Sequence, residues 1–152
     1  FLYIQIHPVL LMSSPDRLMQ TQGSIYRGGE QADPLCGIKK DGSWIVTEEF
    51  LIQIPVCSVS GEKSVLVNGG TVGVGDKFSV FVLPTRDVQL TVTYLEESGT
   101  SVTLLENPIL AQGLAPKRVF KTPLEFGEPK GEDSLKFETM HGSEYSINFV
   151  VD

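Results

Sequence analysis

The chain has 152 residues, a length that suits one domain, and 41% of them are hydrophobic while 20% are charged. This composition is too apolar for a disordered chain and allows a hydrophobic core without metals or dense disulfides. The formal net charge is −7, and only Lys39-Lys40 and Lys117-Arg118 are adjacent basic residues, so a nucleic-acid-binding face, which needs clustered Lys and Arg, is not expected.

The first segment, residues 1–12, is apolar and β-prone (FLYIQIHPVLLM). It is shorter than the roughly 20 apolar residues that cross a bilayer as a helix, so no integral membrane span is expected. The segment predicts either the first strand of the domain or a strand that pairs with a neighbouring subunit, because a terminal strand can complete another chain's sheet. Under the second hypothesis the contacting residues are Phe1, Leu2, Tyr3, Ile4, Ile6, Val9, Leu10 and Leu11.

A short helix and a long loop are expected after the first segment. Ser14 suits a helix N-cap and Pro15 a first helical residue, so residues 15–21 are the one helix candidate. Residues 22–42 are polar and rich in turn-forming residues. They predict a long loop, and surface function often lies on such loops.

The chain contains two cysteines, Cys36 and Cys57, 21 positions apart. A Cys-rich zinc cluster needs more cysteines and is excluded. The pair forms either one disulfide, as in exported proteins, or two buried thiols that pack as small hydrophobic groups. We expect an extracytoplasmic protein, in the periplasm, in the outer envelope or secreted.

The first regular strands are expected after the loop. Residues 44–59 hold one long strand or two, with Pro55 at an edge or a bend. Residues 64–67 and 71–74 flank Asn68-Gly69-Gly70, which predicts a hairpin turn between them. The only tryptophan, Trp44, is expected to anchor the core.

The alternation of apolar and polar residues is strongest in the middle of the chain. Residues 77–83 (KFSVFVL) and 88–94 (VQLTVTY) each place apolar residues on one face, which is typical of half-buried strands. Residues 96–99 predict a hairpin turn into a returning strand at 100–105, which Asn107-Pro108 would end.

The last third of the chain continues the pattern. Residues 118–121 predict a short strand and residues 128–131 a turn. Residues 134–140 alternate, and a turn at His141 leads into residues 144–151, which alternate again. Many short strands at regular spacing predict one all-β domain over residues 1–152, a β-sandwich or barrel.

Residues suited to catalysis are sparse. His7 and His141 are the two histidines, no Gly-x-Ser-x-Gly motif is present, and His141 is expected to be a solvated turn residue. The glycine-rich residues 68–76 run into a strand and lack the Gly-Lys-Ser/Thr ending of a phosphate loop. We therefore predict no catalytic, cofactor-binding or metal-ligating residue, and no enzyme.

Acidic residues occur together at Glu48-Glu49 and in a second group nearer the C-terminus. They lack the alternating Asp/Asn pattern of a calcium loop, so we expect exposed residues that aid solubility, with a weak cation site as the alternative. The later group comprises Glu125, Glu128, Glu132 and Asp133.

Several motifs occur in a fixed order between the middle and the end of the chain. They are Gly75-Asp76-Lys77-Phe78, then Tyr94-Leu95 before an acidic turn with Gly99, then Val102-Thr103-Leu104-Leu105 with Asn107-Pro108, and last Gly131-Glu132-Asp133-Ser134-Leu135-Lys136-Phe137. In this order, residues 76–139 resemble an uncharacterised family of bacterial β-sandwich domains. That family is found in envelope lipoproteins and is appended to caspase-like peptidases and protein kinases. The family usually has Phe-Pro-Asn where this chain has Glu106-Asn107-Pro108.

The resemblance implies an immunoglobulin-like or transthyretin-like antiparallel β-sandwich that is itself non-catalytic. No catalytic residue carries over from the family. The expected function is a structural or assembly subunit of an extracytoplasmic complex or filament, which acts through strand and surface contacts with other protein subunits as a homo-oligomer or larger assembly. The alternative is a ligand- or protein-binding accessory domain of a larger envelope or signalling protein. No cofactor is expected.

Overall fold

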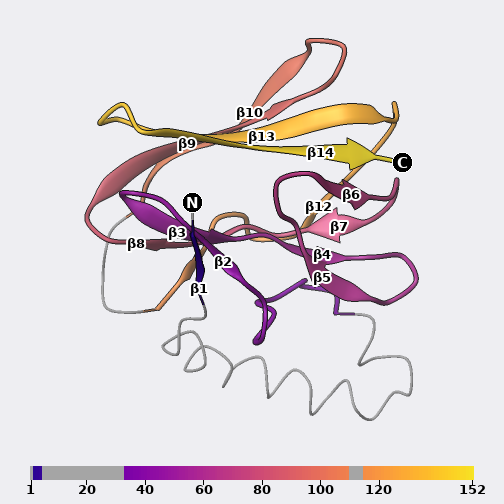
Figure 1. Ribbon diagram of the computed structural model, residues 1–152, viewed down its shortest axis with the longest axis horizontal. Helices are drawn as coiled ribbons and strands as arrows, with labels where there is room; N and C mark the ends of the chain where they lie inside the picture. The colour runs from indigo at the N-terminus through magenta and orange to yellow at the C-terminus, as the bar shows by residue number, and fades with distance from the viewer. Residues whose placement is uncertain (1, 5–32, 110–114) are drawn as a thin grey trace.

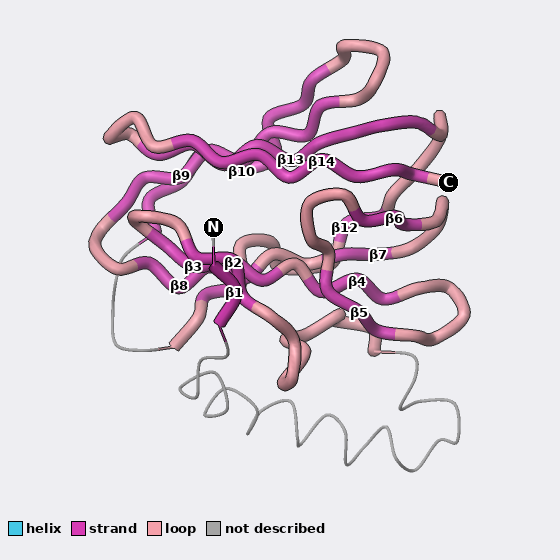
Figure 2. The backbone as a smooth tube through the Cα atoms, in the orientation of Figure 1, coloured by secondary structure: helices cyan, strands magenta, loops and turns pink. Residues whose placement is uncertain are grey.

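A computed structural model describes residues 2–4, 33–109 and 115–152, and all regular structure in these ranges is β-strand (Figure 2). The helix predicted at residues 15–21 and the first part of the loop predicted at 22–42 lie outside the described residues. Residues 33–43, the described remainder of that loop and one further residue, contain no strand. No helix in the described part of the chain is long and apolar enough to cross a membrane.

The described strands form three sheets. The first has the order β1 (Leu2–Ile4), β2 (Trp44–Val46), β3 (Phe50–Gln53), β8 (Phe81–Pro84) and β11 (Lys117–Arg118). The second has the order β12 (Leu124–Glu125), β7 (Lys77–Phe78), β4 (Pro55–Cys57) and β5 (Lys63–Val65). The third has the order β10 (Ser101–Ile109), β9 (Val88–Leu95), β13 (Gly131–Thr139), β14 (Glu144–Val151) and β6 (Gly70–Val72).

The first two sheets form one layer of a sandwich, called the lower layer because it lies below in Figure 1. The third sheet forms the upper layer. Only Ile54 separates β3 from β4, and two residues separate β7 from β8, so the chain passes from one sheet of the lower layer to the other. Ile52 pairs with Val82 and Val56 with Phe78 along these strands. All strand pairs are antiparallel except β6 with β14. The predicted all-β sandwich architecture is confirmed.

The hydrophobic core lies between the two layers, where the inward-facing side chains of the strands meet. In the third sheet, β9, β13 and β14 each bury every second side chain and leave the others toward solvent. Each fully buried Leu, Ile or Phe contributes roughly 1.5–3 kcal/mol relative to exposure. The largest of these side chains include Phe50, Ile52, Phe78, Leu90, Phe126, Leu135, Phe137, Ile147 and Phe149.

Trp44 is buried as predicted, but it belongs to a second, smaller cluster with Ile38, Leu51 and Phe81. The next residue, Ile45, points into the main core. Successive side chains of a strand point to opposite faces, so this smaller cluster lies on the other face of the first sheet. Trp44 therefore anchors the outer side of that sheet and not the space between the layers.

The hairpins predicted at residues 96–99 and 141–143 are confirmed. The N–H of Glu96 donates to the carbonyl of Thr100 at 2.8 Å, and β10 returns along β9. The N–H of Thr139 donates to the carbonyl of Ser143 at 2.9 Å, and β14 returns along β13. Gly99 and Gly142 have φ of 97° and 92°, a region that glycine enters without a steric penalty.

The hairpin predicted around Asn68-Gly69-Gly70 is wrong in its pairing. A turn is present, because the N–H of Gly70 donates to the carbonyl of Val67 at 3.0 Å. However, β5 pairs with β4 in the lower layer, and β6 pairs in parallel with β14 in the upper layer. Turn-forming residues reverse the chain, but they do not decide whether the flanking strands join each other or two different sheets.

Further strand boundaries differ from the prediction. The strand predicted at residues 77–83 is divided into β7 and β8, which belong to two sheets, and the strand predicted at 118–121 is β11 at 117–118. Residues 44–59 form three short strands, not one or two, because residues 47–49 turn between β2 and β3. Strand β10 runs through Pro108 to Ile109 instead of ending before it. Proline lacks an N–H group and is tolerated at the edge of a sheet, where β10 lies.

Truncating a side chain at the centre of the core tests this packing. Phe137 is fully buried on β13, so we expect Phe137→Ala to lower the free energy of unfolding by about 3–5 kcal/mol. Val59 is 77% exposed, and Val59→Ala serves as the control, with a change within about 0.5 kcal/mol. Urea unfolding followed by tryptophan fluorescence measures both values; equal losses for the two variants would contradict the described core.

Candidate functional site

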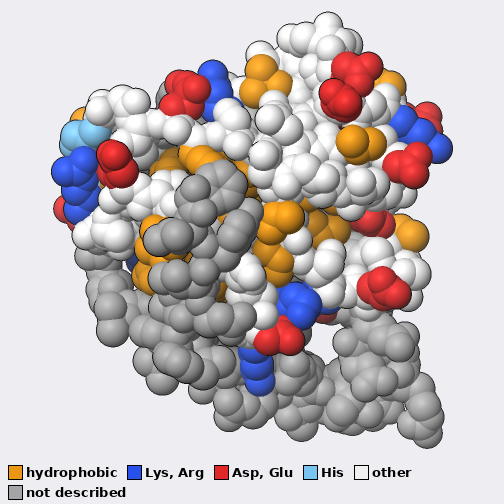
Figure 3. All heavy atoms as spheres, viewed as in Figure 1, with side chains coloured by type: hydrophobic (Ala, Val, Ile, Leu, Met, Phe, Trp, Pro, Cys, Tyr) orange, Lys and Arg blue, Asp and Glu red, His pale blue; other side chains and the backbone are white. Residues whose placement is uncertain are grey.

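Three loops meet at the end of the sandwich drawn on the left of Figure 1. They are residues 47–49 between β2 and β3, residues 85–87 between β8 and β9, and residues 140–143 between β13 and β14. Acidic, basic and histidine side chains lie together at this end (Figure 3). We call it the Glu49 end, after the side chain that joins the three loops.

Glu49, in the first of these loops, is a buried carboxylate with partners in the other two loops and at the end of β13. Glu49 is 1% exposed. Oε1 accepts hydrogen bonds from Nη2 of Arg86 at 2.7 Å and Nε of Arg86 at 3.0 Å. Oε2 accepts one from the hydroxyl of Thr139 at 2.5 Å. Nδ1 of His141 lies 2.9 Å from Oε1.

These hydrogen bonds keep Glu49 ionised. Side-chain hydrogen bonds from Ser143 and Thr139, with the nearby charge of Arg86, outweigh burial and lower the pKa of Glu49 from 4.5 to about 2. An ionised carboxylate can only accept hydrogen bonds. Nδ1 of His141 must therefore carry the proton in the contact with Glu49, which leaves Nε2 on the other side of the ring.

A histidine oriented by a carboxylate is also a component of catalytic triads. Among the described residues, the hydrogen bond of the His141 ring joins Nδ1 to Glu49. Both oxygens of Glu49 accept hydrogen bonds, Oε1 from Arg86 and Oε2 from Thr139. These hydrogen bonds connect the three loops.

The structure changes the expectation for one residue at this end and agrees with it for another. Glu49 was expected to be an exposed acidic residue, and it is buried, whereas its neighbour Glu48 is exposed. His141 is an exposed turn residue, as expected, and Nδ1 of its ring also contacts Glu49. No local signal marks Glu49, because its partners Arg86, Thr139 and His141 are 37, 90 and 92 positions away.

Asp133 is the second buried member of the predicted acidic surface. It accepts hydrogen bonds from the hydroxyl of Tyr94 at 2.5 Å and the N–H of Glu97 at 3.1 Å. Burial, together with the adjacent Asp133 carboxylate, raises the pKa of Tyr94. The remaining predicted acidic residues, Glu125, Glu128 and Glu132, are exposed. Across the described ranges, no three His, Cys, Asp or Glu side chains are grouped as metal ligands would be.

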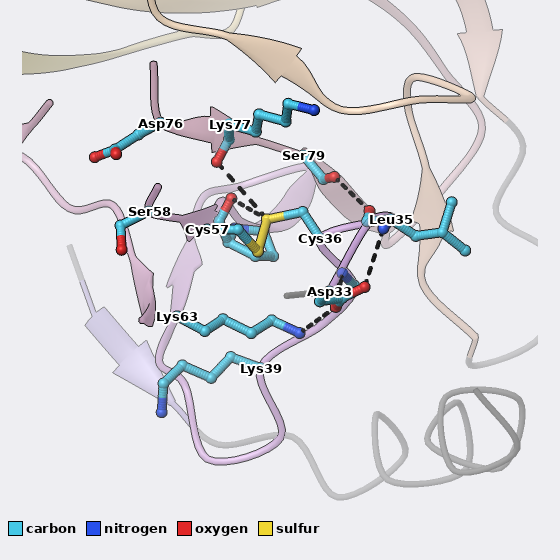
Figure 4. Close-up of a disulfide and its surroundings, with 12 residues drawn as sticks. Asp33, Leu35, Cys36, Lys39, Cys57, Ser58, Lys63, Asp76, Lys77 and Ser79 are labelled. Carbon is cyan, nitrogen blue, oxygen red and sulfur yellow. Dashed lines mark hydrogen bonds and ion pairs between the residues drawn. A yellow bond between two sulfur atoms is a disulfide. The ribbon is translucent and has the colours of Figure 1, made fainter. Parts of the chain in front are cut away.

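A disulfide joins Cys36 to Cys57 of β4, with 5.8 Å between the two Cα atoms (Figure 4). Cys36 is fully buried and has φ of 45°, which is unusual for a residue other than glycine. The sequence left open a disulfide or two buried thiols, and the structure has the disulfide. It fastens the described end of the long loop, residues 33–42, onto the lower layer.

Polar contacts fasten the same loop at further points. The carboxylate of Asp33 accepts hydrogen bonds from the N–H of Gly37 at 2.8 Å and from Nζ of Lys63 at 3.0 Å (Figure 4). These contacts outweigh burial and lower the pKa of Asp33. The buried side chain of Gln53 accepts from the N–H of Lys39 and donates to the carbonyl of the same residue. Residues 33–42 of the loop are therefore attached to the sandwich by several contacts.

The residues predicted for an inter-subunit strand fall into two groups. Leu2, Tyr3 and Ile4 form β1, which pairs antiparallel with β2 of the same chain in the register Leu2 with Val46 and Ile4 with Trp44. The others lie outside the described residues: Phe1, Ile6, Val9, Leu10 and Leu11.

No family model, curated protein or solved structure matches this chain significantly. The resemblance of residues 76–139 to a bacterial envelope domain family stays a prediction from the sequence.

Glu49→Gln tests the role of the buried carboxylate. The folded pKa of about 2 lies below the ordinary 4.5, so the charge contributes stability that is present above pH 4.5 and lost as pH falls toward 2. We expect the variant to unfold at a lower urea concentration than the wild type at pH 7 and to lose less stability between pH 4.5 and 2. Urea midpoints across this pH range measure the effect.

The matched control is Glu48→Gln, which removes the same charge from the exposed neighbour. Its pH profile should follow that of the wild type. If Glu49→Gln also kept the wild-type profile, the carboxylate would not hold the loops as described.

The disulfide gives a second prediction. Replacing both cysteines in Cys36→Ser/Cys57→Ser should lower the free energy of unfolding by about 3 kcal/mol, because the unfolded chain regains conformational freedom. The single variant Cys36→Ser should lose a similar amount, since either change breaks the same bond. Thiol titration of the unfolded, unreduced wild type should find no free thiol. Two free thiols would refute the pairing.

Proposed function

We propose that this chain is a non-catalytic subunit of an extracytoplasmic protein assembly, which binds neighbouring subunits through strand contacts. The observation that carries the proposal is the position of β1. This strand has three residues, lies at the edge of the first sheet, and has β2 as its one neighbour there. Residues 5–43 separate the two strands in the sequence.

An edge strand of this kind can be exchanged between copies at little energetic cost. Its backbone forms the same hydrogen bonds with β2 whether it comes from the same chain or from another. The apolar sequence of residues 1–12 adds side chains that gain from burial against a partner. If the exchange closes on itself, it gives a small oligomer; if it does not, it gives a filament.

Two other observations support the proposed extracytoplasmic location and the proposed non-catalytic role. A disulfide persists in oxidising compartments and is rare in the cytosol, so the Cys36–Cys57 bond favours a place outside the cytoplasm. The Glu49 end is the one cluster of the described residues that resembles catalytic machinery, and the oxygens of its carboxylate are occupied by structural hydrogen bonds.

The second candidate function is an accessory binding domain, and the Glu49 end favours it. The loops there are held in place by one buried carboxylate and present the exposed residues Arg86, Met140 and His141. A surface ordered before binding loses less conformational entropy when a partner docks. This candidate requires no exchange of β1, and the protein would be a monomer.

Removing residues 1–12 distinguishes the two candidates. We expect the intact chain to have a native mass well above 16.7 kDa, and the truncated chain to be a folded monomer of lower mass. Size-exclusion chromatography with light scattering measures mass, and circular dichroism checks the fold.

A second variant replaces residues 1–12 by a Gly-Ser segment of equal length and should behave like the truncated chain. This variant excludes an effect of chain length alone. A monomeric intact chain, or a truncated chain of unchanged oligomeric state, would reject strand exchange and favour the accessory domain.

A further inference from the structure

The turn before β6 contains Asn68-Gly69, the only Asn-Gly pair in the chain. In such a pair the backbone nitrogen of the glycine can attack the side-chain carbonyl carbon of the asparagine, because glycine has no side chain that hinders the approach. The other two asparagines are poorer sites. Asn107 precedes Pro108, whose nitrogen carries no hydrogen to lose. Asn148 precedes Phe149, whose large side chain hinders the approach.

Both reacting groups of Asn68-Gly69 are held by one residue of the neighbouring strand. The N–H of Gly69 donates to the carbonyl of Asn148 at 2.7 Å, and the N–H of Asn148 donates to Oδ1 of Asn68 at 2.8 Å. The attack needs the Gly69 nitrogen to lose its proton, and the electron pair that remains lies where the N–H bond was. In the closed turn this pair would point at the Asn148 carbonyl and not at Cγ of Asn68. The closed turn therefore protects Asn68.

The protecting contacts lie at a part of the sheet that can open by itself. Asn68 and Gly69 are exposed, so water reaches both. Strand β6 has three residues, lies at the edge of the third sheet and has β14 as its one neighbour there (Figure 1). A short edge strand opens at a lower cost in free energy than the core. Opening of β6 would free both reacting groups while the rest of the sandwich stays folded.

We propose that Asn68 is a site of spontaneous deamidation, and that detachment of β6 from β14 controls its rate. In the opened turn, the deprotonated nitrogen of Gly69 forms a bond to Cγ of Asn68, and the side-chain amide takes up a proton and leaves as ammonia. Water then opens the cyclic imide at either of its two carbonyl carbons, which gives aspartate or isoaspartate. Water is the one reactant consumed. The site does not depend on the strand exchange proposed above, because that exchange uses the first sheet.

The isoaspartate product would keep β6 from returning to its place. Its main chain runs through the former side chain and contains an additional methylene group before Gly69. The N–H of Gly69 would then lie out of register with the carbonyl of Asn148. Strand β14, which has eight residues, would become the edge of the sheet, and a long free edge favours pairing with other chains. The aspartate product keeps the original main chain and an acceptor oxygen for the N–H of Asn148.

Peptide mapping by mass spectrometry tests the site on the full-length chain. Folded protein and protein unfolded in guanidinium chloride are kept at the same mildly alkaline pH and temperature. We expect the folded chain to convert Asn68 about tenfold more slowly than the unfolded chain, because opening of β6 must precede the attack. Asn107 and Asn148 should stay intact in both. A folded chain that converts Asn68 as fast as the unfolded chain, or an unfolded chain that keeps Asn68 intact, would overturn the proposal.

Variants of β6 test whether this strand controls the rate. Val72 is 5% exposed and belongs to the main core, so Val72→Ala should loosen β6 and raise the rate in the folded chain about tenfold. Thr71→Gly weakens the same strand from its exposed side and should act in the same direction. Val59→Ala removes the same atoms from a side chain that is 77% exposed and should leave the rate unchanged. Wild-type rates in both β6 variants would exclude control by this strand.

Amide hydrogen exchange tests the effect of the modification. The N–H of Asn148 donates to Asn68, and the N–H of Asp152 donates to the carbonyl of Val72 at 2.8 Å, so both amides report whether β6 is in place. These amides should exchange faster in the chain that contains isoaspartate. Asn68→Asp keeps the main chain and should protect them as the wild type does. Equal protection in the isoaspartate chain and in Asn68→Asp would overturn the detachment of β6.

Discussion

Burial of apolar side chains between two sheet layers is the constraint on which this structure depends. The inward residues of β9, β13 and β14 meet those of β3 and β8, and together they form one continuous core. A strand places alternate residues on opposite faces, so a one-residue slip of β13 along β9 would turn Leu135 and Phe137 toward solvent. The core therefore sets the register of the long strands, and with it the positions of the loops at both ends.

Buried polar groups hold the parts that the core does not reach. A buried carboxylate is tolerated only when hydrogen bonds or opposite charges compensate for its lost hydration. Glu49 and Asp133 each meet this requirement by binding groups far away in the sequence. Each one thereby adds polar contacts between segments that lie far apart in the sequence. The Cys36–Cys57 disulfide has a similar effect on the loop at residues 33–42, which contains no strand of its own.

The buried carboxylate and the sheet edges differ in what they hold together. Glu49 binds Arg86, Thr139 and His141 and so connects the loops at one end of the sandwich. The free backbone groups of the sheets lie at their edges, and these edges differ in length. Strand β1 is short and attached at one side, while β10 has nine residues. The strand exchange proposed above uses the edge of the first sheet at β1.

The sequence by itself determined the all-β architecture, since alternation at residues 88–94, 134–140 and 144–151 reflects only the local geometry of a strand. It also determined the two hairpins whose strands adjoin, because a short turn brings neighbouring residues together. Only the tertiary structure decided that β5 and β6 enter different layers, that Cys36 bonds to Cys57, and that Glu49 is buried. These features join residues 21 to 92 positions apart. Such partners meet only when the layers close, and local patterns of hydrophobicity and turn formation carry no information about them.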